Sequence, residues 1–259
     1  MANNLYLFTT EHEGLATELW FNGILLDEDP EGVFRDRKFP NNLYVIDGEN
    51  TLKLKISLPG QPPRMPESPK LSARLYEMGQ ESTDLTQLPE PIAELNFPGE
   101  EAPTFPAELE TTVSIQSPFP RWSWQDAEPM DVSDGATVRE CLDLVERLHK
   151  ALTAKDLQTV MDLVSTKTEE TAQAYYIPMN ERISDQQTFF EEIFADAQFA
   201  MEPYDAQNME LVPMADDKLI LVRQSNGSAA LESKELIEGF CFTLPIYVSK
   251  VNGEIRIVR

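Results

Sequence analysis

The sequence predicts two domains of different class, an all-β antiparallel sandwich over residues 1–130 and an α+β domain over residues 131–259. Fifteen of the 19 prolines fall in the first range, among short segments in which polar and apolar residues alternate. The second range opens with about sixty residues of helical periodicity and ends in segments of period two. Short strands separated by turns are typical of sandwiches, whereas helices followed by strands indicate an α+β domain.

Alternating segments and tight-turn signals predict the strands of the first domain. Residues 51–58 place leucine or isoleucine at every second position, as a strand with one buried face requires. Asn22-Gly23 separates two apolar segments and predicts a hairpin. Further strands are expected at residues 5–8, 18–21, 24–26, 43–46, 71–78, 92–97 and 109–115.

Two of these segments carry a resemblance to a known architecture. Residues 20–23 (WFNG) and 46–54 (IDGENTLKL) resemble a pattern found in jelly-roll sandwiches, including the accessory domains of glycoside hydrolases. The resemblance implies a jelly-roll-like fold. It does not imply sugar binding, because the glycine and asparagine residues of the pattern serve turns and not ligands.

Apolar residues at helical spacing predict four helices at the start of the second domain. Three of them are expected at residues 138–152, 157–164 and 168–176. Ser184 and Gln187 have the spacing of a capping box, which predicts the start of a fourth helix. The chain then changes from helical periodicity to period two.

The end of the second domain is predicted to form an antiparallel sheet. Pro245 lies inside the longest of its strands and implies an edge position, a bulge or a bend. Asn252-Gly253 is placed to turn the last two strands into a hairpin. The expected strands are residues 209–213, 218–224, 228–232, 239–250 and 254–258.

This order of elements resembles the nuclear transport factor 2 and SnoaL-like superfamily. Residues 148–157 (LHKALTAKDL) are similar to the opening of that fold, and residues 247–257 (YVSKVNGEIRI) are similar to its closing strands. The resemblance implies a cone, in which helices pack on a curved antiparallel sheet around a pocket. Members of the superfamily include enzymes, non-enzymatic binding domains and dimerisation domains.

The residues that could line such a pocket do not form a recognisable catalytic set. Enzymes of the superfamily usually place an Asp–His or Asp–Tyr set inside the cone, and no such set can be identified here. His149 lies beside the apolar stripe of a helix and is interpreted as a helix-surface or core residue. The pocket candidates are Tyr175, Tyr176, Glu191 and Tyr247, although large aromatic side chains can equally fill a core.

Two segments of the first domain contain groups that could bind a metal ion. In the acidic loop 27–31, Asp27, Asp29 and Glu31 offer oxygen ligands for calcium. Calcium needs about 6–8 oxygens from several segments, so a solvated loop is the simpler interpretation and no metal or cofactor is expected. Residues 11–13 (Glu-His-Glu) are interpreted as a surface triplet, because adjacent side chains of an extended segment diverge.

Trp122 and Trp124 stand where the two predicted domains meet. An extended segment would place both indoles on one side, where they could stack on a sugar ring or hold a proline of a partner. They could equally fill the interface between the two domains. The second interpretation is preferred, and carbohydrate binding remains the weakest functional alternative.

Both domains are acidic, with 45 acidic and 21 basic residues and a formal net charge of −24. Such a field repels phosphate backbones and anionic lipid surfaces, so neither nucleic acid nor a membrane is expected as a partner. The only compact basic cluster is Arg35, Arg37 and Lys38, which could clamp a carboxylate or phosphate. We expect these residues to pair instead with Asp36 or with the neighbouring acidic loop.

The sequence also favours a cytoplasmic protein. Its first residues lack the charged and apolar regions of a signal peptide, and no run of about 18 apolar residues occurs. Cys141 lies in a helical stripe and Cys241 in a strand, which is typical of buried, reduced thiols. A disulfide between them is the alternative.

The function predicted from the sequence is binding without catalysis. No phosphate loop, dinucleotide fingerprint, Gly-x-Ser-x-Gly or His-Glu-x-x-His motif is present. The leading hypothesis is a protein that presents an acidic surface to a basic protein partner, as an immunity or adaptor protein would. The alternatives are a small-molecule pocket or a SnoaL-like enzyme in the second domain, and the oligomeric state stays open.

Overall fold

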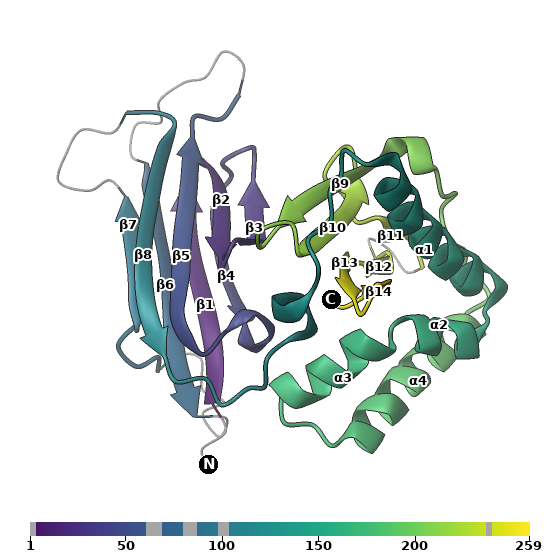
Figure 1. Ribbon diagram of the computed structural model, residues 1–259. Helices are drawn as coiled ribbons and strands as arrows, with labels where there is room; N and C mark the ends of the chain where they lie inside the picture. The colour runs from purple at the N-terminus through teal and green to yellow at the C-terminus, as the bar shows by residue number, and fades with distance from the viewer. Residues whose placement is uncertain (1–3, 61–68, 80–86, 98–103, 237–239) are drawn as a thin grey trace. The chain divides into compact units, whose positions relative to one another are not determined.

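The computed structural model describes residues 4–60, 69–79, 87–97, 104–236 and 240–259. The contacts of the chain divide it into two compact units, Met1–Arg121 and Trp122–Arg259 (Figure 1). Over these described ranges, 14 strands form four antiparallel sheets accompanied by four α-helices, so the protein is mixed α/β and rich in sheet. The dividing point lies nearer the N-terminus than residue 130, and Trp122 and Trp124 belong to the second unit.

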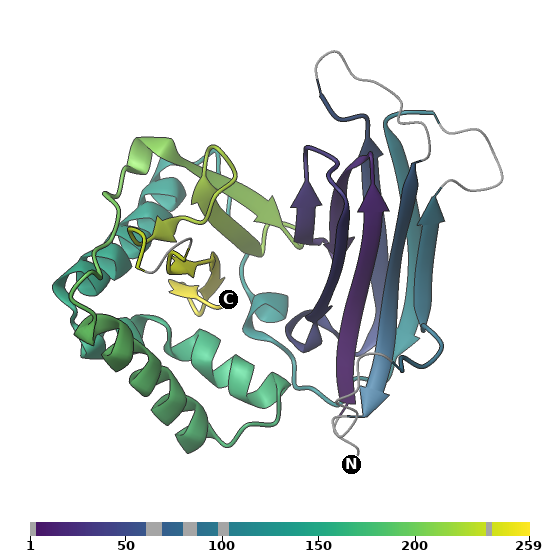
Figure 2. The same ribbon diagram turned by 180° about the vertical axis from the view of Figure 1, so that it is seen from behind.

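The first unit consists of two four-stranded antiparallel sheets, which Figures 1 and 2 show from opposite sides. One sheet has the strand order β4-β1-β6-β7 and the other β3-β2-β5-β8. The strands are β1 (Asn4–Glu13), β2 (Ala16–Phe21), β3 (Ile24–Asp29), β4 (Arg35–Pro40), β5 (Gly48–Ser57), β6 (Lys70–Gly79), β7 (Ala93–Phe97) and β8 (Ala107–Ile115). Phe8 on β1 and Phe21 on β2 are buried with ring centroids 5.2 Å apart, so side chains of both sheets meet in one core.

The alternation read from the sequence is present in β5, where Leu52, Leu54 and Ile56 are all buried. The predicted hairpin between β2 and β3 is also confirmed. Asn22 and Gly23 form its turn with φ angles of 51° and 73°. Asparagine and glycine tolerate this left-handed region better than other residues, which explains the strength of the signal.

Two local predictions in the first unit are wrong. Residues 43–46 do not form a strand, because Asn42–Tyr44 is a short 3-10 helix. The strand β4 was not expected, since its residues Arg-Asp-Arg-Lys-Phe-Pro carry charge instead of alternating apolar groups. In the described part of the chain, β4 is an edge strand whose pairing partner is β1. An edge strand is open on one side, so it does not require an alternating apolar face.

The second unit opens with helices and closes with sheets, as the sequence predicts. Its main sheet has the order β14-β13-β10-β9, and a second sheet contains β11 and β12. The helices are α1 (Gly135–Ala154), α2 (Leu157–Leu163), α3 (Ser165–Ala174) and α4 (Met179–Ala195). The strands are β9 (Met209–Met214), β10 (Leu219–Gln224), β11 (Leu231–Glu232), β12 (Thr243–Leu244), β13 (Ile246–Val251) and β14 (Glu254–Ile257).

The core of the second unit joins helices to sheet. Leu148 and Leu152 on α1, Val160 on α2 and Val248 on β13 belong to one buried apolar cluster. The three helix residues belong to the apolar stripes predicted from the sequence, and Val248 lies on the buried face of the hairpin formed by β13 and β14. Within the described part of the chain, no helix has both the length and the apolar character needed to cross a membrane.

Two details of the second unit differ from expectation. Ser184 does not cap a helix, because α4 begins at Met179 directly after Pro178, and proline suits a helix start. The strand expected at 239–250 is interrupted, with β12 ending before Pro245 and β13 starting after it. Pro245 has no amide hydrogen and therefore cannot continue the ladder. Gly239, the start of that predicted strand, lies outside the described residues.

Candidate functional site

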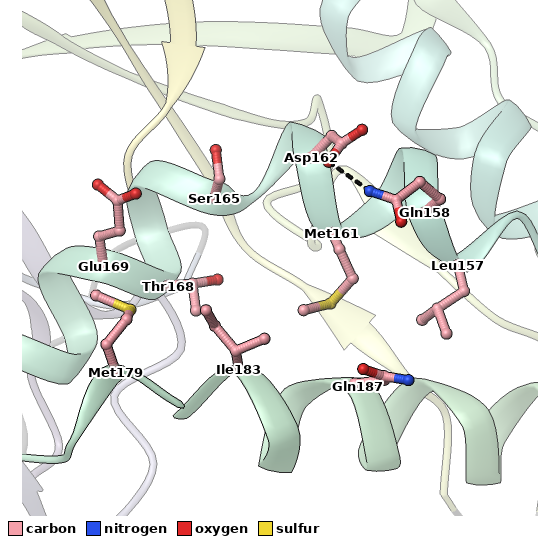
Figure 3. A pocket seen from close by; sticks show the side chains of 10 residues that line it. All are labelled: Leu157, Gln158, Met161, Asp162, Ser165, Thr168, Glu169, Met179, Ile183 and Gln187. Carbon is pink, nitrogen blue, oxygen red and sulfur yellow. Dashed lines mark hydrogen bonds between the residues drawn. The ribbon is translucent and has the colours of Figure 1, made fainter. Parts of the chain in front are cut away.

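A groove of about 470 Å³ lies in the second unit between α4 and the pair α2 and α3 (Figure 3). Its volume is within the usual range of ligand pockets, about 300–1,000 Å³. All of its lining side chains come from these three helices. They are Leu157, Gln158, Met161, Asp162, Ser165, Thr168, Glu169, Met179, Ile183 and Gln187.

The first wall of the groove is built on α2 and α3, which follow each other almost without a break. The Val164 amide donates to the Val160 carbonyl (3.1 Å), and the Thr168 amide donates to the Val164 carbonyl (2.9 Å). Helical bonding therefore continues across the junction. As a result, Leu157, Met161 and Thr168 recur at intervals of four and seven residues and share one face.

The opposite wall is one face of α4. Met179, Ile183 and Gln187 follow one another at intervals of four residues. Figure 3 shows Met179 and Ile183 pointing toward α2 and α3, and Met161 pointing back toward α4. We call the apolar surface formed by Met161, Met179 and Ile183 the floor of the groove. Ile183 is 43% exposed, which is high for a large apolar side chain, so this floor is accessible.

The outer edge of the groove on the α2 and α3 side is acidic. Asp162, Ser165 and Glu169 are exposed and, in Figure 3, point away from α4. The Gln158 amide donates to the Asp162 carboxylate (2.8 Å) and fixes its direction. None of the ten lining residues is basic. Among the described residues, the groove thus combines an apolar floor with an acidic rim that has no basic residue in its lining.

Polar and apolar contacts hold the two walls in place. The Thr168 hydroxyl on α3 lies within hydrogen-bonding distance of the Gln186 side-chain oxygen on α4. Phe190 on α4 is buried in the core and meets Phe242 with ring centroids 6.3 Å apart. The Gln187 amide donates to Glu191 one turn further along α4 (2.7 Å). These contacts fix α4 beside α3 and against the core.

Lys167 and Arg182 lie on the same helices but do not line the groove. The ammonium group of Lys167 donates to the Pro245 carbonyl between β12 and β13 (3.3 Å). Burial, with the positive charges of Arg259 and Arg182, lowers the pKa of Lys167 to about 8. The Lys167 ammonium group is therefore directed at the Pro245 carbonyl and does not line the groove.

The four pocket candidates from the sequence are placed outside the groove. Tyr175 and Tyr176 follow the end of α3, Glu191 is exposed on α4, and Tyr247 lies on β13. None of them lines the groove. The groove was missed because its floor consists of methionine and isoleucine, which sequence patterns assign to the core.

Trp122 and Trp124 are buried, with exposed fractions of 0% and 5%. The guanidinium group of Arg259 lies 5.4 Å from the centre of the Trp122 ring. Glu170 pairs with Arg259 and also accepts a hydrogen bond from the Ser123 amide (2.6 Å). Neither indole has the exposed face that stacking on a sugar requires, so the structure offers no carbohydrate platform at these two positions.

His12 is not part of a surface triplet, contrary to expectation. It is 1% exposed, and its Nε2 lies 2.8 Å from the carboxylate of Asp29, which is fully buried. At the end of β1, His12 is turned inward between exposed Glu11 and Glu13, as opposite faces of a strand allow. The sequence gives little sign of this, because residues 5–8 form a continuous apolar run and do not show which face of β1 is buried.

The acidic loop and the basic cluster neutralise each other. Asp27 pairs with Arg37, and Arg35 lies 3.5 Å from Asp29, as predicted. The Glu31 amide donates to Asp29 (3.1 Å). Among the residues that the structure describes, no group of three or more His, Cys, Asp or Glu side chains could hold a metal ion.

His149 and the two cysteines, which the sequence analysis also singled out, have no features of a catalytic site within the described part of the chain. His149 Nε2 lies 2.8 Å from the Glu202 carbonyl, and its ring is next to Tyr204. Cys141 and Cys241 are free thiols, and burial raises the pKa of Cys141 to about 11, which makes it a poor nucleophile.

Comparisons of the chain with family models, curated proteins and solved structures give no match.

Proposed function

We propose that this protein binds a basic protein partner through its acidic surface and does not catalyse a reaction. The observation that carries the proposal is the way its charges are distributed. At least ten lysine and arginine residues of the described chain already lie at ion-pair distance from carboxylates of the same chain. With 45 acidic against 21 basic residues, the charge that remains for a partner is negative.

The groove provides a place where this charge can act together with apolar burial. Residues 156–196, which include α2, α3 and α4, contain nine acidic and two basic residues. Apolar contacts at the floor supply binding free energy, while complementary charges at the rim accelerate encounter and select partners. An acidic rim beside an exposed apolar floor therefore suits a basic partner with an apolar contact face.

A small-molecule ligand is the second candidate, because the volume of about 470 Å³ would hold one. However, small-molecule sites usually direct several polar groups toward the ligand. Here Asp162, Ser165 and Glu169 point outward (Figure 3), and the floor offers mainly Met161, Met179 and Ile183. This arrangement favours the protein partner.

Association kinetics at increasing salt concentrations test the proposal. Proteins captured on the immobilised chain at low ionic strength would be identified, purified and mixed with it in a stopped-flow instrument. We expect basic partners whose association rate constant falls at least about tenfold between low and physiological salt, where the Debye length is about 8 Å. A rate constant that does not respond to salt, or partners that are acidic, would contradict the proposal.

A further inference from the structure

We infer that the groove between α2, α3 and α4 is the docking site of a single amphipathic α-helix with a basic flank. This inference rests on the proposed function and names the class of partner that the groove accepts. Three features support it: the length of the groove, the nature of its floor and the one-sided position of its acidic rim.

The length of the groove matches a short helix. Its first wall runs from Leu157 to Thr168, which is roughly 16 Å at 1.5 Å per residue. The α4 wall runs from Met179 to Gln187, or roughly 12 Å. A helix of about three turns covers these lengths, and two helical walls leave between them the long, narrow depression in which a third helix packs.

The floor suits the apolar face of such a helix. Met161 and Met179 have unbranched, flexible side chains that adapt to the shape of an incoming residue. Leu157 and Ile183 add branched apolar surface at the two walls. Helix-binding grooves are filled by side chains at positions i, i+3 or i+4 and i+7 of the ligand. A ligand helix with leucine-sized residues at these positions would cover the exposed part of Ile183.

The charges define which flank of the ligand must be basic. Asp162 and Glu169 are seven residues apart, so they lie two helical turns apart on the same edge of the groove. Lysine or arginine residues seven positions apart on one flank of the ligand would meet both carboxylates. A second copy of this chain is the wrong occupant, because a net charge of −24 on each copy opposes self-association.

A synthetic peptide tests the inference directly. The probe is a fluorescein-labelled peptide of about 14 residues with leucine at positions i, i+4, i+7 and i+11, lysine on one flank and alanine elsewhere. One control peptide has the same composition apart from two central prolines, which prevent a helix. Another has glutamate in place of lysine. Fluorescence anisotropy at low salt should show binding of the basic helical peptide and at least about tenfold weaker binding of both controls.

Protein variants locate the site. Met161→Gln and Ile183→Asn should each weaken binding of the helical peptide by about tenfold, because each places a polar group against its apolar face. The double variant Asp162→Asn, Glu169→Gln should weaken binding and reduce its salt dependence. The matched control is Asp185→Asn, Glu192→Gln, which removes two exposed carboxylates with the same spacing on α4 and should bind as the unaltered chain does.

The outcomes separate this inference from the proposed function. Equal binding of the helical and proline peptides, or no effect of Met161→Gln and Ile183→Asn, would overturn the inference while basic partners could still bind elsewhere. Hydrogen exchange with and without peptide gives a test independent of variants, and protection outside residues 157–187 would also overturn it. A dimer in light scattering that Met161→Gln dissociates would assign the groove to a second copy.

Discussion

Asp29 lies at the end of β3 with no exposed surface, and its environment is set by three neighbours. Burial alone would raise the pKa of this carboxyl. The hydrogen bonds from His12 and the Glu31 amide, together with the charge of Arg35, outweigh burial and lower the pKa below its ordinary value of 3.8. Because His12 is on β1 and Asp29 on β3, this contact joins the two sheets of the first unit.

Replacing this carboxylate should destabilise the protein in a pH-dependent way. Asp29→Asn removes the charge opposite His12 and Arg35 and should lower the free energy of unfolding at pH 7 by about 2–3 kcal/mol. A lowered folded pKa means that the stabilisation is fully present above pH 3.8 and is lost as the pH falls through the folded value. The difference between Asp29→Asn and the unaltered chain should therefore shrink below about pH 4.

Urea unfolding at several pH values measures both effects. Asp36→Asn is the matched control, because Asp36 is exposed on the adjacent strand β4. Its effect at pH 7 should stay within about 0.5 kcal/mol. Equal effects of the two substitutions would show that the contact between His12 and Asp29 contributes nothing to stability.

At the level of elements, the loop between β3 and β4 depends on one glycine. Gly32 has a φ of +66°, and a Cβ atom there would stand 2.9 Å from backbone atoms of Leu15. The Gly14 amide also donates to the Gly32 carbonyl (2.9 Å), so two loops of the first unit approach closely at this point. Backbone atoms cannot move aside as a flexible side chain would.

Gly32→Ala should therefore lower the free energy of unfolding by about 1–3 kcal/mol. Gly79→Ala is the control in the same unit, since a Cβ atom at Gly79 meets none of the described residues within 4 Å and its φ is not in the left-handed region. That substitution should be neutral or slightly stabilising. The measurement is the urea midpoint of both variants, and a Gly32→Ala protein as stable as Gly79→Ala would contradict the steric argument.

Some helices and strands could be predicted from the sequence and others could not. The alternation in β5 and the apolar stripes of α1 and α2 were predictable, because each reports burial of one face of a single element. The strand β4 was not, because its pairing with β1 decided it and not an apolar face. The start of α4 was predictable from Pro178, but the capping-box spacing of Ser184 and Gln187 pointed to a later start. The groove was not predictable either. It depends on how α4 lies beside α2 and α3, which no local pattern records.

On the scale of the whole molecule, the segment before α1 belongs with the second unit. The Glu128 amide donates to the Lys250 carbonyl (2.9 Å), and the Met130 amide donates to the Asp217 carbonyl (2.8 Å). Trp122 is buried beside Arg259, as described above. A boundary at residue 130, as the proline distribution suggested, would cut through these contacts.

Two truncated chains should therefore behave differently. We expect residues 122–259 to fold cooperatively alone, because that range contains the helices, both of its sheets and the segment that pairs with β13. Residues 131–259 lack Trp122, Trp124 and Met130, and loss of buried aromatic side chains typically costs about 3–5 kcal/mol each. Such a loss is a large part of the stability of a small domain. Thermal unfolding followed by circular dichroism should show a clear transition for the longer chain and a lower or absent one for the shorter. Equal transitions would mean that the tryptophan segment does not stabilise the second unit, and an unfolded longer chain would show that this unit needs residues 1–121.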